Sequence, residues 1–115
     1  MKKSNTKYSG SYEKLEQAAK DLKERNYVLR LYVTGATPKS TRAIENIRHI
    51  CDTELEGRYD LQVIDVYQKP SLAKDEQIIA IPTLIKKLPL PLRRLVGDLS
   101  DMERVLFGLD LKPKE

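Results

Sequence analysis

The chain has 115 residues, of which 40% are hydrophobic and 33% are charged, with a formal net charge of +4. This composition predicts one soluble domain with a single core, and no apolar run approaches the roughly 18–20 residues that cross a membrane. The polar N-terminus argues against secretion, and the single cysteine argues against a disulfide framework. The basic and acidic residues are interleaved, which argues against a nucleic-acid partner. We therefore expect a cytoplasmic protein.

The sequence divides into an extension at residues 1–26, a domain at 27–111 and a short tail at 112–115. From Ser11 to Asn26, apolar residues recur at three- and four-residue steps, which predicts an amphipathic helix. The members of this stripe are Tyr12, Leu15, Ala18, Ala19 and Leu22. Such a helix docks either on its own domain or on a partner, and docking on its own domain is the commoner outcome.

The first half of the domain reads as strand, helix and strand. Residues 27–34 are rich in β-forming side chains, and Thr37-Pro38 is typical of a helix N-cap followed by proline at the first helical position. This helix is predicted to run to about Leu55. The nearly continuous apolar run at 61–67 predicts a central strand buried on both faces, joined to the first by a right-handed parallel crossover.

The second half reads as a short helix, two strands and a final helix. Pro70 opens the helix predicted at 71–79, and Pro82 stands directly before a strand at 83–88, where the geometry of the residue before proline fits. A second strand at 92–96 follows so closely that the pair must be antiparallel. A capping box at 100–103 predicts a helix ending at Gly108. The order βαβαββα, after an extra N-terminal helix, predicts a thioredoxin-like α/β fold.

The reactive groups of a thioredoxin-like enzyme are missing. Such enzymes keep a cysteine at the start of the first helix, where the helix dipole stabilises a thiolate, but residues 35–40 contain no sulfur. Cys51 falls on the apolar helix face and is predicted to be an inert core residue. His49 is predicted at the surface with no ligand partner, and Asp65 is either a buried functional acid or a strand-end carboxylate. We therefore expect no catalytic residue, metal or cofactor.

Six separated segments carry a family resemblance. They are Tyr27–Gly35, Thr37–Pro38, Val63–Val66, Ile81–Leu84, Arg93–Ser100 and Gly108–Leu111. In this order and spacing the chain resembles the KaiB family, which comprises small non-enzymatic regulators of the KaiC ATPase in the cyanobacterial circadian clock and in related bacterial systems. The resemblance implies a protein that binds a KaiC-like ATPase, in circadian timing or in a related stress-adaptation system.

The resemblance also implies two folds. Family members populate a thioredoxin-like monomer that binds KaiC and a usually tetrameric state in which the second half rearranges to give βαββααβ. We predict the thioredoxin-like state and keep the second fold, as a dimer or tetramer, as the alternative. The switching region corresponds to Pro82, Pro89, Pro91, Gly108 and Asp110. Gly108→Ala is predicted to shift the balance between the folds, because alanine disfavours a positive φ.

By position, the resemblance assigns partner binding to Arg42, Asp60 and Gln62, although family members often carry lysine where Gln62 stands. For Arg42 the alternative is a solvated helix arginine. A basic cluster on the predicted hairpin, formed by Lys86, Arg93 and Arg94, faces a partner, lines an oligomer cleft or is simply solvated.

Two features depart from the family: the common Pro-Pro-Pro stretch is Pro89-Leu90-Pro91 here, and the sequence ends without the acidic tail typical of clock members. A stress-related role or another partner therefore stays open. The other functional readings are a thioredoxin-like redox protein and a sensor domain of a KaiB-domain histidine-kinase system, although no kinase sequence follows.

Overall fold

The computed structural model describes residue 14 and residues 26–111. The helix predicted from residue 11 therefore lies outside the described residues, except for Lys14, which is helical and exposed. The predicted tail at 112–115 also lies outside them.

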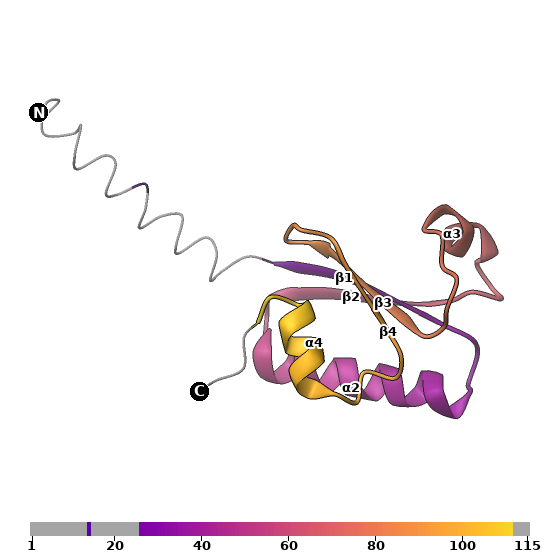
Figure 1. The fold of residues 1–115 in the computed structure, drawn as a ribbon, viewed down its shortest axis with the longest axis horizontal. Coiled ribbons are helices and arrows are strands. Elements are labelled where there is room, and N and C mark those ends of the chain that lie inside the picture. The colour runs from indigo at the N-terminus through magenta and orange to yellow at the C-terminus, as the bar shows by residue number, and fades with distance from the viewer. Residues whose placement is uncertain (1–13, 15–25, 112–115) are drawn as a thin grey trace, which may run out of the picture.

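The described residues follow the predicted order βαβαββα. The elements are β1 (Tyr27–Val33), α2 (Pro38–Glu54), β2 (Tyr59–Asp65), α3 (Pro70–Asp75), β3 (Thr83–Leu88), β4 (Arg93–Val96) and α4 (Met102–Gly108) (Figure 1). The start of α2 is as predicted: Pro38 is the first helical residue, and the Thr37 hydroxyl accepts a hydrogen bond from the Ser40 N–H at 3.2 Å.

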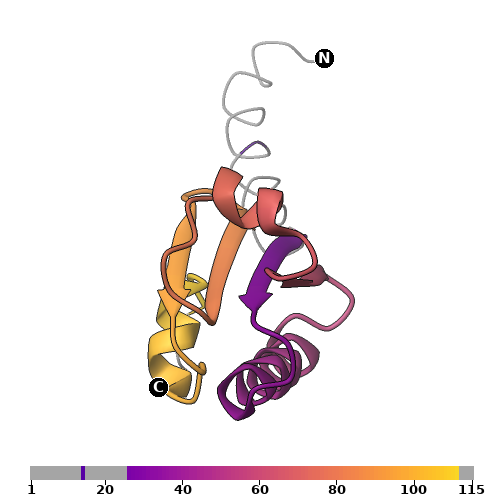
Figure 2. The ribbon, with the colours of Figure 1, turned by 90° about the vertical axis from the view of Figure 1, so that its right-hand side faces the viewer.

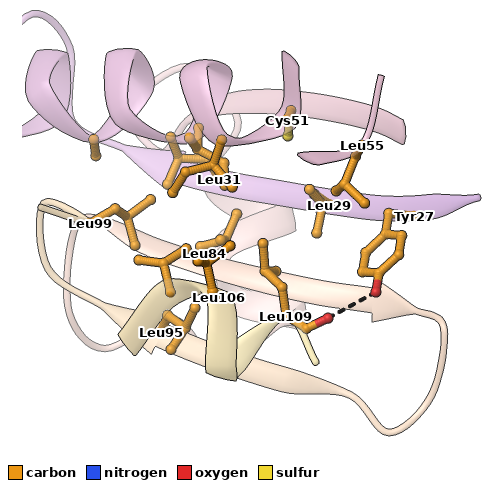
Figure 3. Close-up of a cluster of buried hydrophobic side chains, with 14 of the residues drawn as sticks. Tyr27, Leu29, Leu31, Cys51, Leu55, Leu84, Leu95, Leu99, Leu106 and Leu109 are labelled. Atoms are coloured by element: carbon orange, nitrogen blue, oxygen red, sulfur yellow. Dashed lines mark hydrogen bonds between the residues drawn. The ribbon is translucent and has the colours of Figure 1, made fainter. Parts of the chain in front are cut away.

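One mixed sheet carries all four strands in the order β2-β1-β3-β4. β1 runs parallel to β2 and antiparallel to β3, and β3 runs antiparallel to β4. Helices α2 and α4 cover one face of the sheet, and α3 lies on the other side (Figure 2). The larger core lies between the sheet and the α2/α4 layer, so we call this face the helix face (Figure 3).

The main core contains residues from the first strand and from the end of the last helix. The Tyr27 hydroxyl donates a hydrogen bond to the Leu109 carbonyl at 3.0 Å, which ties the start of β1 to the residue after α4 (Figure 3). Leu29, Leu31 and Leu84 are fully buried beneath the helices. The fold of the C-terminal segment therefore depends on the core that β1 and β3 build.

The prediction that the second strand is central and buried on both faces was wrong. β2 is an edge strand, and Ile64 is its only buried residue. β1 takes the centre because β3 pairs with its other side. The apolar run looked central because Ile64 packs with Tyr32 and Ile85 under the α3 segment, whereas Asp60 and Gln62 on the same face are exposed.

Both short helices differ from their predicted limits. α3 ends at Asp75 rather than near residue 79, and Gln77 follows with a positive φ of 56°. α4 is capped by Asp101 rather than Ser100: the Asp101 carboxylate accepts the Arg104 N–H at 3.2 Å. The Ser100 N–H is already bonded to the Asp98 carboxylate at 3.1 Å, which keeps Ser100 in the preceding loop.

The predicted switching residues occupy distinct backbone environments. The peptide bonds before Pro82, Pro89 and Pro91 are all cis. The positive φ predicted for Gly108 belongs instead to Asp110, at 62°. Gly108 is required for another reason, because a Cβ built there would lie 2.7 Å from Leu95 Cδ2. The glycine therefore lets α4 approach β4 closely.

Candidate protein-binding site

The turn where thioredoxin-like enzymes place their nucleophile holds only capping groups here. The Thr37 hydroxyl bonds the Ser40 N–H, and the Ser40 hydroxyl accepts the Thr34 N–H at 3.2 Å. Cys51 is fully buried in the main core, and this burial raises the pKa of its thiol to about 12. The prediction that Cys51 is a core residue is confirmed, and its thiolate is disfavoured at physiological pH.

Cys51 is therefore expected to be unreactive in the folded protein. At pH 8, a disulfide reagent such as dithiodipyridine should release almost no thiopyridone from the native chain and one equivalent after denaturation. Rapid stoichiometric reaction of the native chain would contradict this burial.

His49 is exposed on α2, as predicted. Over residue 14 and residues 26–111, no group of three or more His, Cys, Asp or Glu side chains could hold a metal ion. Asp65 is the last residue of β2, and its carboxylate accepts the Tyr67 N–H at 2.9 Å. Of the two readings of Asp65, the strand-end carboxylate is the one that the structure shows.

The outer edge of β2 offers backbone groups to a partner. Within the described residues β2 pairs with β1 alone, so its other side is unpaired. Asp60 and Gln62 are exposed on the sheet face that points away from α2, opposite Val28 and Arg30 of β1. An exposed strand edge of this kind can accept a strand from another chain, with flanking side chains selecting the partner.

Arg42 lies elsewhere, on the exposed side of α2. Its Nε donates to Asp98 Oδ2 at 3.2 Å, and Asn46 Nδ2 donates to the Asp98 carbonyl at 2.8 Å. Hydrogen bonds from Ser100, and then from Arg42, lower the pKa of Asp98. Arg42 therefore holds the β4–α4 loop, a contact for which the sequence gives no signal.

The three predicted binding residues are not brought into one cluster. Arg42 belongs to the helix layer, whereas Asp60 and Gln62 lie on the opposite face of the sheet. Arg42 is bonded to Asp98 in the β4–α4 loop, whereas the side of α2 next to β2 carries Asp52, which accepts a hydrogen bond from the Tyr59 hydroxyl. A partner that contacts Arg42 as well as Asp60 and Gln62 must therefore reach both faces of the sheet.

The basic cluster predicted on the hairpin does not exist as one surface. Strand alternation puts Lys86 on the helix face, where it is 1% exposed and forms an ion pair with Asp110. Arg93 lies opposite Lys86 and also reaches Asp110, with Nη2 3.2 Å from Oδ1. Arg94 points to the other face and donates to the Glu76 carbonyl at 2.6 Å. The alternative that this cluster is simply solvated is therefore wrong for Lys86, which is buried.

Asp110 is the centre of this network. Hydrogen bonding from Lys86, followed by its charge and by Arg93, lowers the pKa of the Asp110 carboxyl. Because Asp110 follows α4 and Lys86 belongs to β3, the ion pair fastens the C-terminal turn to the sheet. No buried side-chain nitrogen or oxygen in the described residues lacks a hydrogen-bond partner.

A family model described as the KaiB domain matches residues 30–111. The chain belongs to the KaiB family. A relative named circadian clock oscillator protein KaiB, from Acaryochloris marina (strain MBIC 11017), is 55% identical over 91 residues, covering 79% of this chain and 88% of the relative. The protein of the same name from Synechococcus elongatus is 54% identical over 87 residues, covering 76% of this chain and 85% of the relative.

Solved structures confirm the thioredoxin-like fold of this KaiB-family chain. The N-terminal domain of Synechococcus elongatus SasA superposes with a TM-score of 0.62 at 24% identity, covering 79% of this chain and 90% of that domain. Mitochondrial thioredoxin 3 from Saccharomyces cerevisiae superposes with a TM-score of 0.61 at 13% identity, covering 84% and 88%. In the described part of the chain, no helix has the length and apolar character needed to span a bilayer.

Proposed function

We propose that this KaiB-family chain is a non-enzymatic, protein-binding regulator of a KaiC-type ATPase, in circadian timing or a related stress-adaptation system. The observation that carries the proposal is the 55% identity, over most of both chains, to a protein named circadian clock oscillator protein KaiB. The buried thiol and the sulfur-free turn before α2 support a binding role for the scaffold rather than redox chemistry.

The binding surface in this proposal is the β2 edge together with the exposed side of α2. Main-chain hydrogen bonds to the unpaired edge supply affinity, while Asp60, Gln62 and Arg42 select the partner. The predicted roles of these residues thus stand as a proposal. Arg42 would also transmit contact to the β4–α4 loop through Asp98, to which it is bonded.

The proposal includes a second fold and a homo-oligomer from which the partner selects the thioredoxin-like state. α3 has 6 residues and α4 has 7, far below the roughly 12–15 that an isolated helix needs in water. Both helices therefore depend on tertiary contacts. For α4 and the turn that follows it, the most specific of these are the Lys86–Asp110 pair and the Gly108–Leu95 approach. A ligand shifts such an equilibrium by its differential affinity for the two states.

Reversing the charge beside the strand edge tests the surface. Asp60→Lys is expected to weaken binding to a purified KaiC-type ATPase at least about tenfold, equivalent to ~1.4 kcal/mol, because it changes a side chain flanking the docked edge. The measurement is biolayer interferometry against the immobilised ATPase, after circular dichroism has confirmed the fold.

Glu103→Lys is the matched control, since it makes the same charge change at an exposed position on α4. Its affinity should stay within about twofold of the parent chain, about 0.4 kcal/mol. Equal losses in both variants would show a general charge effect and overturn the assignment to β2. Absence of binding by the parent chain would overturn the proposed function itself.

A further inference from the structure

The loop between β3 and β4 exposes an unusual amount of apolar surface. Leu88, Leu90 and Leu92 are 48%, 69% and 48% exposed, and they alternate with Pro89 and Pro91. We call residues 88–92 the hairpin tip. Scattered exposed leucines need no explanation, but a contiguous apolar stretch of this kind marks a contact surface.

The hairpin tip also forms one wall of a shallow groove of about 270 Å³, lined by Asn26, Leu88, Pro89 and Leu90. This volume lies below the roughly 300–1,000 Å³ typical of small-molecule pockets and suits a few aliphatic side chains. Asn26 is the first residue of the continuous described chain, and its place in the groove follows from the sheet. Val28 of β1 pairs with Leu88 of β3, so the chain enters the domain beside the hairpin tip (Figure 1).

The chain that precedes Asn26 has 25 residues, and the KaiB family match begins only at residue 30. Its sequence predicts an amphipathic helix with a single apolar stripe. We propose that residues 11–25 dock this stripe on the groove at the hairpin tip. The occupant is thus a segment of the same chain, added outside the family match, and the contact is independent of ATPase binding.

The connection is short enough for this contact. Lys23, Glu24 and Arg25 separate Leu22 from Asn26, so the Cα atoms of Leu22 and Asn26 are four steps apart and lie at most about 14 Å from each other. The stripe from Tyr12 to Leu22 is about 16 Å long as a helix, which matches an apolar loop of five residues better than a single pocket. Leu22 and Leu15 would supply the aliphatic groups that cover the leucines of the tip.

Tethering favours this occupant over a second copy of the chain. A segment attached beside its site is present at an effective concentration in the millimolar range, whereas a second copy must lose translational and rotational freedom to occupy the same groove. Covering the tip within one chain also removes the apolar surface that would otherwise promote self-association.

A spin label on the predicted polar side of the segment tests the contact in the full-length chain. Gln17→Cys introduces one reactive thiol, because Cys51 is buried and its pKa is about 12. The label should broaden the amide signals of Leu88, Leu90 and Leu92. It should leave unchanged the amide signal of Ile79, which is 97% exposed in the α3–β3 connection, at the end of β3 opposite to the hairpin tip.

Three further samples test the contact and identify its occupant. Adding Leu22→Asp to the labelled chain should abolish the broadening at the hairpin tip, whereas Lys20→Asp, on the polar side, should preserve it. Mixing spin-labelled unenriched chain with unlabelled ¹⁵N-enriched chain should give no broadening. Broadening in the mixed sample would show a second copy in the groove, and no broadening in the labelled chain would show that the segment does not dock; either result overturns the proposal.

Discussion

Asp110→Asn is expected to lower the free energy of unfolding by about 2–3 kcal/mol. Lys86 is 1% exposed, and the substitution removes the carboxylate that neutralises it. Breaking a buried ion pair from one side costs roughly 3–5 kcal/mol, and the partial exposure of Asp110, at 38%, reduces that cost. Asparagine tolerates the positive φ of 62° at this position, so the backbone is not strained by the change. Chemical denaturation with two optical probes measures the effect.

The Lys86→Met background separates the charge from the packing. Methionine fills a similar volume without a charge, and replacing a buried ion pair with apolar groups is often neutral or stabilising. Asp110→Asn should therefore cost less than about 1 kcal/mol in the Lys86→Met background. An equal cost in both backgrounds would show that the ion pair contributes nothing.

The stability lost through Asp110→Asn should depend on pH. The Lys86 interaction lowers the folded-state pKa of Asp110, so its stabilisation is present above the unfolded pKa, about 3.9, and is lost as the pH falls through the folded value. The difference in stability between the parent chain and Asp110→Asn should therefore be full at pH 6 and should shrink below about pH 4. A difference that stays constant into acid would contradict the role of the carboxylate.

Gly108→Ala is expected to lower the free energy of unfolding by about 1–2 kcal/mol, despite the higher helix propensity of alanine. The added Cβ would lie within 3.0 Å of three side-chain atoms of Leu95, which is only 8% exposed and has little room to move. Overpacking of this kind costs about 1–3 kcal/mol, and the gain in helix propensity offsets up to about 1 kcal/mol. Thermal and denaturant unfolding measure the change.

Leu95→Ala provides the control, because it removes the atoms that the new methyl group would meet. In that background Gly108→Ala should be neutral or stabilising, so the double-mutant cycle should give a coupling of at least about 1 kcal/mol. Additive effects would show that the close approach is not the cause. If the proposed second fold is populated, Gly108→Ala and Asp110→Asn should both increase it, seen as a second set of amide signals from residues 78–111.

The order of elements could be predicted because each boundary carries a local signal. Thr37-Pro38 marks the start of α2, and the short link between β3 and β4 imposes an antiparallel pair whatever the rest of the chain does. The burial of Cys51 followed from its helical spacing. These features depend on neighbours in sequence, which is why sequence patterns suffice for them.

The predictions that were wrong depend on contacts between residues that are far apart in the sequence. The apolar run in β2 does not reveal which strand occupies the centre of the sheet, because that depends on β3 pairing with β1. Lys86 was placed on the surface by its charge, although it shares a strand face with the buried Leu84. The alternation of side chains along β3 does indicate that Lys86 is buried. Its ion-pair partner, Asp110, lies 24 residues away in the sequence, so no local pattern points to it. The Arg42–Asp98 contact spans 56 residues and has no local signal.

The location of the partner contact is the central claim, and hydrogen exchange in the complex measures it most directly. The full-length chain is incubated in deuterated buffer with and without a KaiC-type ATPase, and peptides are analysed by mass spectrometry. We predict slower exchange in β2, residues 59–65, and in α2, residues 38–54, when the ATPase is present. The exchange of peptides from α4 and β3 should be the same with and without the ATPase. A complex that protects neither β2 nor α2, or the absence of any complex, would contradict the account.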